Sequence, residues 1–461
     1  MAESWTISED ELTWTFKLQD GVTWHDGEPF TSEDVKFTYD LMMEQGLGYM
    51  YSIYLTGINS IECPDETTVV ITTEEPKANM LMNTTPIIPK HIWEAIPVEE
   101  LEMYANDNPI GTGPYKFDSS TEGVIKLVKN EAYFSTLPTV DEYIFVSYSN
   151  ADTLAQSLML GEIDAATNIN PAQKKQLSED ENINIISGEI PGFMQVGVNC
   201  WTDPASGGNP LLKDKAIRQA IEYAMDKQKL VSMAYGGEGE LGTTLLNPGG
   251  FFHYEPTGDE LRSYNVEKAN ALLDAAGYKD SDGDGIRESK DGEKLEFSMI
   301  TIADNSEEIK SGQMIASDCS KVGISIKTVT MDDGALQDNI DAGTFDLFIW
   351  GWGGDLDPSV ILELLTTDMI GYSNEPHFSN ARYDELYISQ MTMMDEMERQ
   401  AAIFEMQKIA YDEAPYIILL YDNNLQAIRS DRWTGFKKIP ENGPFFFNLT
   451  FDNYMNIKPI E

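Results

Sequence analysis

The chain has 461 residues, and its 78 acidic residues against 31 basic residues give a formal net charge of −47. This charge excludes proteins that bind nucleic acids or anionic membrane surfaces, because those proteins need a basic face that releases counterions. Hydrophobic residues make up 41% of the chain and aromatic residues 10%. That is too much apolar material for an acidic disordered chain, and the length predicts about two to three folded domains.

The chain has three cysteines, Cys63, Cys200 and Cys319. Because they have no CxxC spacing, they predict neither a disulfide framework nor a thiolate metal site, and we expect all three to be small buried residues. No apolar stretch approaches the roughly 18 residues that cross a bilayer. The segment from Met1 to Trp5 has no basic region followed by an apolar one, so we expect no signal peptide in this chain.

The first half of the chain predicts strands alternating with helices. Apolar residues alternate with polar ones from Leu12 to Leu18, which is typical of a half-buried strand. Thr31 is the expected N-cap of the next helix, with Asp34 in the place of the capping-box glutamate. A Gly-rich turn at 108–114 runs into a strand, and a further strand is predicted at 194–198.

The second half continues in the same manner. One long amphipathic helix is predicted from about Asp214 to Gly236, and Asn265 caps another helix that ends at Gly277. The remaining predicted strands lie at 295–301, 324–330, 345–350 and 416–421, and the predicted helices lie near 307–321, 360–365 and 395–411. This alternation predicts the α/β class, with mixed twisted sheets and flanking helices.

From Trp14 to Val35 the sequence reads WTFKLQDGVTWHDGEPFTSEDV. This segment resembles the signature region of the family 5, peptide-type, extracellular solute-binding proteins of ATP-binding-cassette (ABC) importers. Further markers follow in the family's order over essentially the whole chain: IPKHIW at 88–93, GTGPY at 111–115, GEID at 161–164, VN at 198–199, IRQA at 217–220, AMDK at 224–227, ALL at 271–273, AGY at 276–278, WGWGGDLDP at 350–358, YDEL at 383–386 and TGF at 434–436.

The resemblance implies a periplasmic-binding-protein-like fold, a two-lobed clamp with an extra domain that closes on its ligand about a hinge. Mapped by motif, residues 1–107 are the expected extra α/β domain, residues 108–195 with 425–461 the first lobe, and residues 196–424 the second lobe. In the family, an export or lipoprotein signal and some dozens of residues precede the segment that Ala2 to Trp5 resembles. We therefore expect an N-terminally truncated chain that lacks first-lobe strands.

The segment from Trp350 to Pro358 carries the candidate ligand site. Gly353 and Gly354 let a ligand main chain approach the backbone, and Trp352 supplies a flat apolar wall. In peptide-binding relatives, a Trp-x-x-Asp pattern at this place supplies the aspartate that binds the peptide ammonium, and the resemblance assigns this role to Asp355. The alternative is that Asp355 and Asp357 cap the helix near residue 359, with Trp352 in the core.

Two residues after the strand at 194–198, Asn199 and Trp201, are further candidate ligand contacts. They lie where the chain enters the predicted second lobe. The alternative assigns them to a hinge turn and to packing.

An acidic loop, DSDGDG at 280–285, resembles an EF-hand calcium loop with carboxylates at positions one, three and five and glycine at position six. The predicted ligands are Asp280, Asp282, Asp284 and Asp291. Asp291 stands at the twelfth position, where such loops usually have glutamate, and the alternative is a solvated turn between a helix and a strand. No other cofactor is expected.

The sequence predicts a non-enzymatic, extracytoplasmic binding protein, monomeric, that captures di- or oligopeptides in an interlobe cleft and delivers them to the membrane permease of an ABC importer. Alternatives within the family are an oligosaccharide, which would suit aromatic walls such as Trp201, Trp350 and Trp352, or a nickel-type ligand, for which a single surface-loop histidine, His377, gives little support. An extracellular hydrolase is a third alternative, and no GxSxG, HExxH or P-loop motif supports it. The net charge also fits a surface adapted to high salt.

Overall fold

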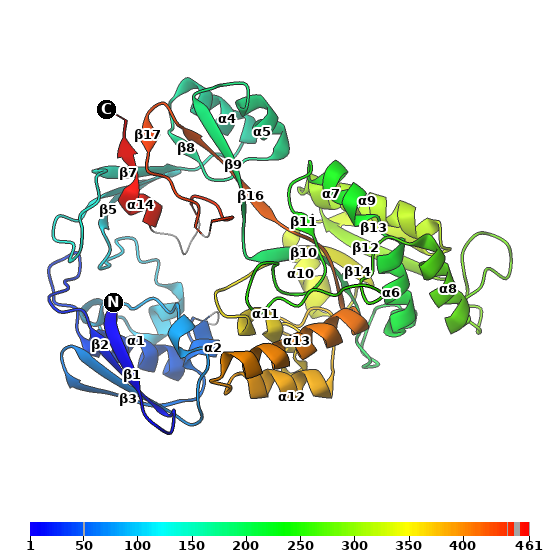
Figure 1. Ribbon diagram of the computed structural model, residues 1–461, viewed down its shortest axis with the longest axis horizontal. Coiled ribbons are helices and arrows are strands. Elements are labelled where there is room, and N and C mark those ends of the chain that lie inside the picture. The colour runs from blue at the N-terminus through cyan, green and yellow to red at the C-terminus, as the bar shows by residue number, and fades with distance from the viewer. Residues whose placement is uncertain (49–50, 440, 447–451, 461) are drawn as a thin grey trace. The chain divides into compact units, whose positions relative to one another are not determined.

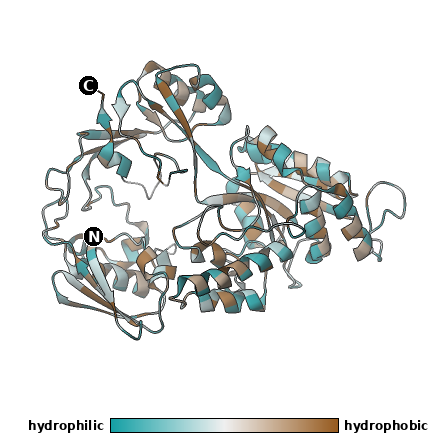
Figure 2. Cartoon of the chain, in the orientation of Figure 1, coloured by the Kyte–Doolittle hydropathy of each residue, from teal (hydrophilic) through white to brown (hydrophobic). Residues whose placement is uncertain are grey.

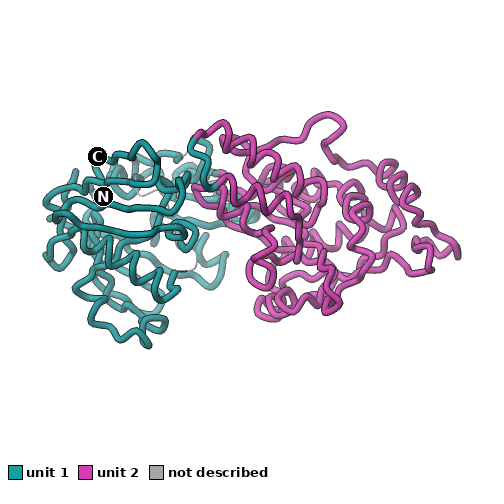
Figure 3. Tube along the Cα trace, turned by 90° about the horizontal axis from the view of Figure 1, so that it is seen from below, with its two compact units in different colours: residues 1–188, 391–394, 425–461 teal, residues 189–390, 395–424 magenta. Residues whose placement is uncertain are grey.

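The computed structural model describes residues 1–48, 51–439, 441–446 and 452–460 (Figure 1). The chain forms two compact units (Figure 3). Unit 1 contains residues 1–188, 391–394 and 425–461, and unit 2 contains residues 189–390 and 395–424. The separation of residues 1–107 as an extra domain stays a prediction.

Unit 1 begins with an antiparallel sheet of four strands in the order β1 (Ala2–Ile7), β2 (Thr13–Leu18), β4 (Thr68–Thr73) and β3 (Ile58–Asp65). Its β2 confirms the strand that the alternating pattern predicts. Helix α1 (Ser32–Gln45) also begins as predicted, with the backbone N–H of Thr31 donating to Asp34 Oδ2 at 2.8 Å. Trp14 and Trp24 anchor the core beneath this sheet, and each is only 2% exposed.

The rest of unit 1 contains three smaller sheets, an antiparallel β5-β6-β7, a three-stranded β8-β16-β9 and a two-stranded β17-β18. Helices α4 and α5 lie beside the second of these sheets and share its core. The bounds are α2 (Ser52–Leu55), α3 (Lys90–Trp93), β5 (Tyr115–Thr121), β6 (Val124–Lys129), β7 (Glu142–Val146), α4 (Ala151–Leu160), β8 (Ala165–Ala166), α5 (Pro171–Leu177), β9 (Ile183–Glu189), β16 (Asn423–Arg429), β17 (Trp433–Thr434), α14 (Asp452–Asn456) and β18 (Lys458–Pro459).

Unit 2 is built on a six-stranded mixed sheet in the order β11-β15-β10-β14-β12-β13. Strand β12 runs parallel to β13 and β14, and the other pairs are antiparallel. Figure 2 shows apolar residues along its central strands, which are buried on both faces. The bounds are β10 (Gly192–Val198), β11 (Glu240–Leu241), β12 (Glu296–Ile302), β13 (Ser325–Met331), β14 (Leu347–Gly353) and β15 (Tyr416–Tyr421).

Helices cover this sheet. Helix α9 packs on β12 and β13 through Gly312, where a Cβ would lie 3.1 Å from Thr301 Cγ2. Helices α12 and α13 lie side by side (Figure 1). The bounds are α6 (Lys215–Ala224), α7 (Lys227–Ala234), α8 (Val266–Ala276), α9 (Ser306–Ser320), α10 (Asp333–Asp341), α11 (Ser359–Glu363), α12 (Ala381–Gln390) and α13 (Glu396–Glu413).

The prediction of one long helix from Asp214 to Gly236 is wrong in one respect, because this segment forms two helices, α6 and α7. Met225 between them has an extended backbone, with φ −82° and ψ 125°. Asp226 then caps α7 by accepting a hydrogen bond from the backbone N–H of Lys229 at 3.0 Å. An aspartate that can satisfy a free helix N–H ends one helix and starts the next, which hydrophobic periodicity alone does not reveal.

The cysteine prediction holds for two of three residues. Cys200 and Cys319 are free and buried, whereas Cys63 is only half-buried. The Cys63 thiol donates to the carbonyl oxygen of Ser32 at 3.3 Å, which places it at the edge of the first sheet rather than in the core.

Across the residues that the structure describes, we find no helix that combines the length and the apolar character required to span a bilayer.

A buried ion pair joins α13 to the start of α11. Arg399 Nη2 donates to both oxygens of Asp357, at 3.0 and 2.8 Å, and to Ser359 Oγ at 3.0 Å. Arg399 Nε donates to Gln390 Oε1 at 3.0 Å. Arg399 is 5% and Asp357 1% exposed, so each charge depends on the other for its solvation.

We expect Arg399→Met to lower the free energy of unfolding by about 3–5 kcal/mol, because it leaves the Asp357 carboxylate buried without its counter-charge. The matched control is Arg382→Met, which breaks an ion pair with Glu405 whose side chains are 49% and 45% exposed. That loss should be much smaller, because both charges are largely solvated. Urea unfolding of both variants tests the difference, and equal losses would contradict the burial argument.

Candidate functional site

The candidate site begins in β14, which is longer than predicted. The strand does not end at Trp350 but runs on through Trp352 to Gly353, paired with β10 as far as Gly192. Gly192 has φ 132°, and a Cβ there would lie 2.3 Å from the carbonyl oxygen of Trp352. A glycine at this place therefore lets the pairing continue, and Trp352 is a strand residue rather than a loop residue.

Aromatic side chains gather on one face of the sheet. Directly paired residues of neighbouring strands point to the same side, and β10 pairs Phe193 with Trp352 and Gly197 with Phe348. Gly197 also pairs with Tyr416 of β15. A Cβ at Gly197 would lie 2.1 Å from the Phe348 ring, so the missing side chain makes room for that ring.

A buried carboxylate, Glu375, holds two of these aromatic residues. Its Oε2 accepts hydrogen bonds from Trp352 Nε1 at 3.1 Å and from the Tyr416 hydroxyl at 2.7 Å. Glu375 is 3% exposed, and burial raises its pKa to about 7 despite these two donors. No sequence pattern predicts this residue, because it lies 23 positions after Trp352 and the intervening chain folds back to reach it.

The open end of β14 exposes backbone. The N–H of Gly354 donates to the carbonyl oxygen of Pro191 at 2.9 Å, which closes the strand pair. Asn247 fixes the same end of β10, because its Oδ1 accepts from Gly192 N–H at 2.8 Å and its Nδ2 donates to Ile190 O at 3.0 Å. Gly353 is exposed, and a Cβ there would meet nothing within 4 Å. The main chain beside Trp352 is thus accessible and rigidly held.

Asp355 and Asp357 have different surroundings. Asp355 is half-buried at the end of this segment, and its Oδ1 accepts from the backbone N–H of Leu356 at 2.6 Å. Asp357 is buried, accepts from the N–H of Ser359 at 2.9 Å and pairs with Arg399. Asp357 therefore bonds the first backbone N–H of α11, although the N-cap position itself is Pro358, and the ligand role of Asp355 stays a prediction.

Asn199 and Trp201 lie at the far end of β10. Asn199 is 3% exposed, and its Nδ2 donates to the carbonyl oxygens of Gly343 and Phe345 at 3.0 and 2.8 Å. Its Oδ1 accepts from Trp201 N–H at 3.0 Å. These bonds join the chain after β10 to the chain before β14. Such a role agrees with the alternative that Asn199 is a hinge-turn residue. A ligand role for Asn199 stays a prediction.

The Trp201 ring lies against His377, with ring centroids 4.4 Å apart. The prediction of His377 as a surface-loop residue is wrong, since it is 4% exposed and its Nε2 lies 3.0 Å from the carbonyl oxygen of Ile340. Ring packing against Trp201 on one side and a backbone carbonyl on the other keep it inside unit 2.

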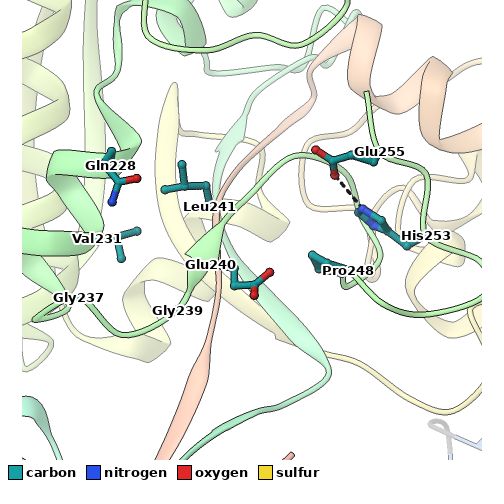
Figure 4. A pocket seen from close by; sticks show the side chains of 9 residues that line it. All are labelled: Gln228, Val231, Gly237, Gly239, Glu240, Leu241, Pro248, His253 and Glu255. Atoms are coloured by element: carbon teal, nitrogen blue, oxygen red, sulfur yellow. Dashed lines mark hydrogen bonds and ion pairs between the residues drawn. The ribbon is translucent and has the colours of Figure 1, made fainter. Parts of the chain in front are cut away.

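A concavity of about 600 Å³ lies between α7, β11 and the loop after Asn247 (Figure 4). No sequence motif predicts this concavity, because its lining residues come from α7, β11 and the neighbouring loops, which only the folded chain brings together. In Figure 4 the His253 ring points toward Glu255, and its Nε2 lies 2.8 Å from Glu255 Oε2. The lining residues are Gln228, Val231, Gly237, Gly239, Glu240, Leu241, Pro248, His253 and Glu255.

The acidic loop at 280–285 brings together three of its four predicted ligands. Carboxylate oxygens of Asp280, Asp282 and Asp284 lie within 4.8 Å of one another and of Glu288, and Asp291 is not a member of this group. Glu288 was not predicted. It occupies the ninth position of the loop, where EF-hand loops also place a ligand. Its position in the sequence could therefore have predicted it as a ligand. Calcium binding itself stays a prediction.

Residues 1–371 match the family described as bacterial extracellular solute-binding proteins, family 5 Middle. The chain belongs to this family. It is 28% identical over 451 residues to the oligopeptide-binding protein AppA of Bacillus subtilis, covering 96% of this chain and 81% of AppA.

Solved structures agree with the family assignment. The structure of Bacillus subtilis AppA in complex with a nonapeptide matches with a TM-score of 0.80 and 26% identity, covering 100% of this chain and 90% of that one. NikZ from Campylobacter jejuni in complex with Ni(L-His) matches with a TM-score of 0.82 and 25% identity, covering 98% and 90%. The predicted periplasmic-binding-protein-like α/β fold is confirmed.

Glu375 predicts a pH dependence of stability. Its pKa rises from an ordinary 4.5 to about 7 on folding, so between these values the folded chain holds a proton that the unfolded chain has lost. The free energy of unfolding therefore falls as pH rises through this window. Glu308, whose pKa burial also raises to about 7, acts in the same window, so a variant is needed to isolate Glu375.

We expect Glu375→Gln to gain stability relative to the parent chain by about 3 kcal/mol between pH 4.5 and pH 7.5, because glutamine carries no charge to desolvate. Urea unfolding at several pH values measures this difference. Glu267→Gln, on the exposed face of α8, is the control and should follow the parent at every pH. A difference that is independent of pH would contradict the burial argument.

Proposed function

We propose that this chain is the extracytoplasmic receptor of an ABC importer that captures peptides and delivers them to the membrane permease. The observation that carries the proposal is the match to AppA holding a nonapeptide, which extends over 100% of this chain at a TM-score of 0.80. The family is one of extracellular solute-binding proteins. We infer that the protein acts as a monomer without catalysing a reaction, and that a lipid anchor or a secretion signal places it outside the cytoplasm.

The candidate site has features that suit a peptide. An extended peptide is held mainly by main-chain hydrogen bonds, which are independent of its side chains. The exposed backbone at Gly353 offers such groups, and the Trp352 ring, fixed by Glu375, offers an apolar wall next to them. A permissive peptide binder needs both an open main chain and a rigid support.

The carboxylate of Asp355 would bind the ammonium group at the peptide N-terminus. It follows Gly353 and Gly354 directly and is half-buried, so the pair would be partly shielded from solvent. A charge-assisted hydrogen bond of this kind contributes about 1.5–3 kcal/mol. The net charge of −47 adds a field that draws the cationic end of a ligand toward the protein.

Asn199 and Trp201 would serve this site as positioning residues. Asn199 ties the ends of β10 and β14 together, away from Gly353, and so fixes the strand that carries Trp352. We infer that its replacement would lower ligand affinity by loosening β14 rather than by removing a contact.

Native mass spectrometry of freshly purified protein tests the ligand class. We expect additional mass that fragments into peptide sequences, because binding proteins of this kind retain ligand when dissociation is slow. A retained nickel complex, haem or oligosaccharide would contradict the peptide assignment. Incubation with bound peptides should yield no cleavage products, and turnover would contradict a purely binding role.

We expect Asp355→Ala to weaken peptide binding by roughly tenfold to a hundredfold in isothermal titration calorimetry, because the peptide ammonium loses its charged partner. The matched control is Asp338→Asn, an exposed aspartate on α10 that should bind like the parent.

A second binding experiment uses a peptide whose N-terminus is acetylated and therefore carries no ammonium group. The parent chain should lose affinity for the acetylated peptide, and the Asp355→Ala variant should bind both peptides equally. If the variant still discriminates between the two peptides, the ammonium is bound elsewhere.

A further inference from the structure

The acidic loop between α8 and β12 carries more negative charge than its own chain neutralises. Asp280, Asp282, Asp284 and Glu288 each offer a carboxylate oxygen, and these oxygens lie within 4.8 Å of one another. The ion pairs described for this group both involve Lys294, which bonds Asp282 at 2.9 Å and also Asp284. Four carboxylates thus face one ammonium group.

Glu288 distinguishes this loop from an ordinary solvated acidic turn. It is 6% exposed, whereas Asp280, Asp282 and Asp284 are exposed. Its Oε2 accepts from the backbone N–H of Ser281 at 2.7 Å. Its Oε1 is buried and, among the described residues, receives no hydrogen bond. A buried carboxylate oxygen without a donor is costly, and a bound cation would remove that cost.

The backbone explains why Glu288 reaches the loop and Asp291 does not. Residues 279 and 288 pair in antiparallel fashion, with Lys279 N–H donating to Glu288 O at 3.1 Å and Glu288 N–H to Lys279 O at 2.9 Å. This pair closes the acidic loop. Asp291 lies beyond it in a second turn, where Gly292 N–H donates to Ser289 O at 3.0 Å. The twelfth position of an EF-hand is therefore not available here.

We propose that Asp280, Asp282, Asp284 and Glu288 form a calcium site, in which the ninth position of the loop replaces the twelfth. Calcium prefers several oxygen ligands in flexible geometry, which three exposed aspartates and one fixed glutamate supply. Magnesium demands a tighter octahedron and keeps its waters, so it fits this set less well. The bound ion would hold the long connection between α8 and β12 closed.

Lys294 is the competitor for this site. Its Nζ bonds two of the four carboxylates, so calcium entry displaces it from Asp282 and Asp284. The Lys294 side chain is 30% exposed and can turn into solvent. The competition weakens calcium binding and sets it in the range of about 10⁻⁴–10⁻³ M found for extracellular modules, where calcium is abundant.

The experiment uses the full chain after chelator treatment and dialysis, with calorimetric Tm measured in calcium chloride, magnesium chloride and sodium chloride of equal ionic strength. We expect calcium at about a hundredfold excess over its dissociation constant to raise Tm by about 3 °C. No calcium shift beyond that of sodium chloride, or an equal shift with magnesium, would overturn the proposal.

Four variants identify the ligands. Asp282→Asn, at an exposed position that does not threaten folding, and Glu288→Gln should each lose the calcium shift. Asp291→Asn is the matched control and should keep it. Loss of the shift in Asp291→Asn to the same extent as in Asp282→Asn would overturn the assignment of Glu288 and restore the EF-hand pattern.

The fourth variant, Lys294→Met, tests the competition. Without calcium it should have a lower Tm than the parent, since four carboxylates then repel one another with no counter-charge. Calcium should bind it roughly tenfold tighter than the parent and more than restore its Tm. If Lys294→Met gains nothing from calcium, the lysine alone neutralises the loop and the proposal fails.

Discussion

The pairing of β10 with β14 is the constraint on which the candidate site depends. Side-chain amides secure both ends of the pair, Asn247 at Ile190 and Gly192 and Asn199 at Gly343 and Phe345. Between them, the pair runs without a described irregularity. A one-residue slip would turn every side chain of the strand to the opposite face, so these amides fix which face Trp352 occupies.

The buried carboxyl group of Glu375 adds a desolvation cost to the sheet that β10 and β14 form. A hydrophobic residue in its place would pack without a desolvation cost, yet it could not orient the Trp352 indole and the Tyr416 hydroxyl through one oxygen. Glu375 therefore lowers the stability of the fold but fixes the orientation of the Trp352 ring. The buried pair of Arg399 and Asp357 at the start of α11 also carries a desolvation cost, which its own hydrogen bonds offset.

Much of the fold could be predicted from sequence, because strand periodicity, N-caps such as Thr31 and Asn265, and motif order are local signals. The segment around Trp352 and Asp355 was singled out through its resemblance to the family's motif, and its ligand role stays a prediction. Glu375, Asn247 and the His253 concavity could not be found, since they act through contacts that only the folded chain creates. The error at Met225 has a local cause, because hydrophobic periodicity persists across a break that one capping aspartate produces.

The glycines around the end of β14 differ in whether they could be replaced by a residue with a side chain during evolution. A side chain at Gly192 or Gly354 would strike backbone or Pro191, whereas one at Gly353 would enter open space at an ordinary backbone conformation. A single substitution at Gly353 could therefore reshape the proposed ligand surface while leaving the strand pair intact. Within one stable scaffold, this is a position at which descendants could acquire a new ligand preference before any other part of the protein has to adapt.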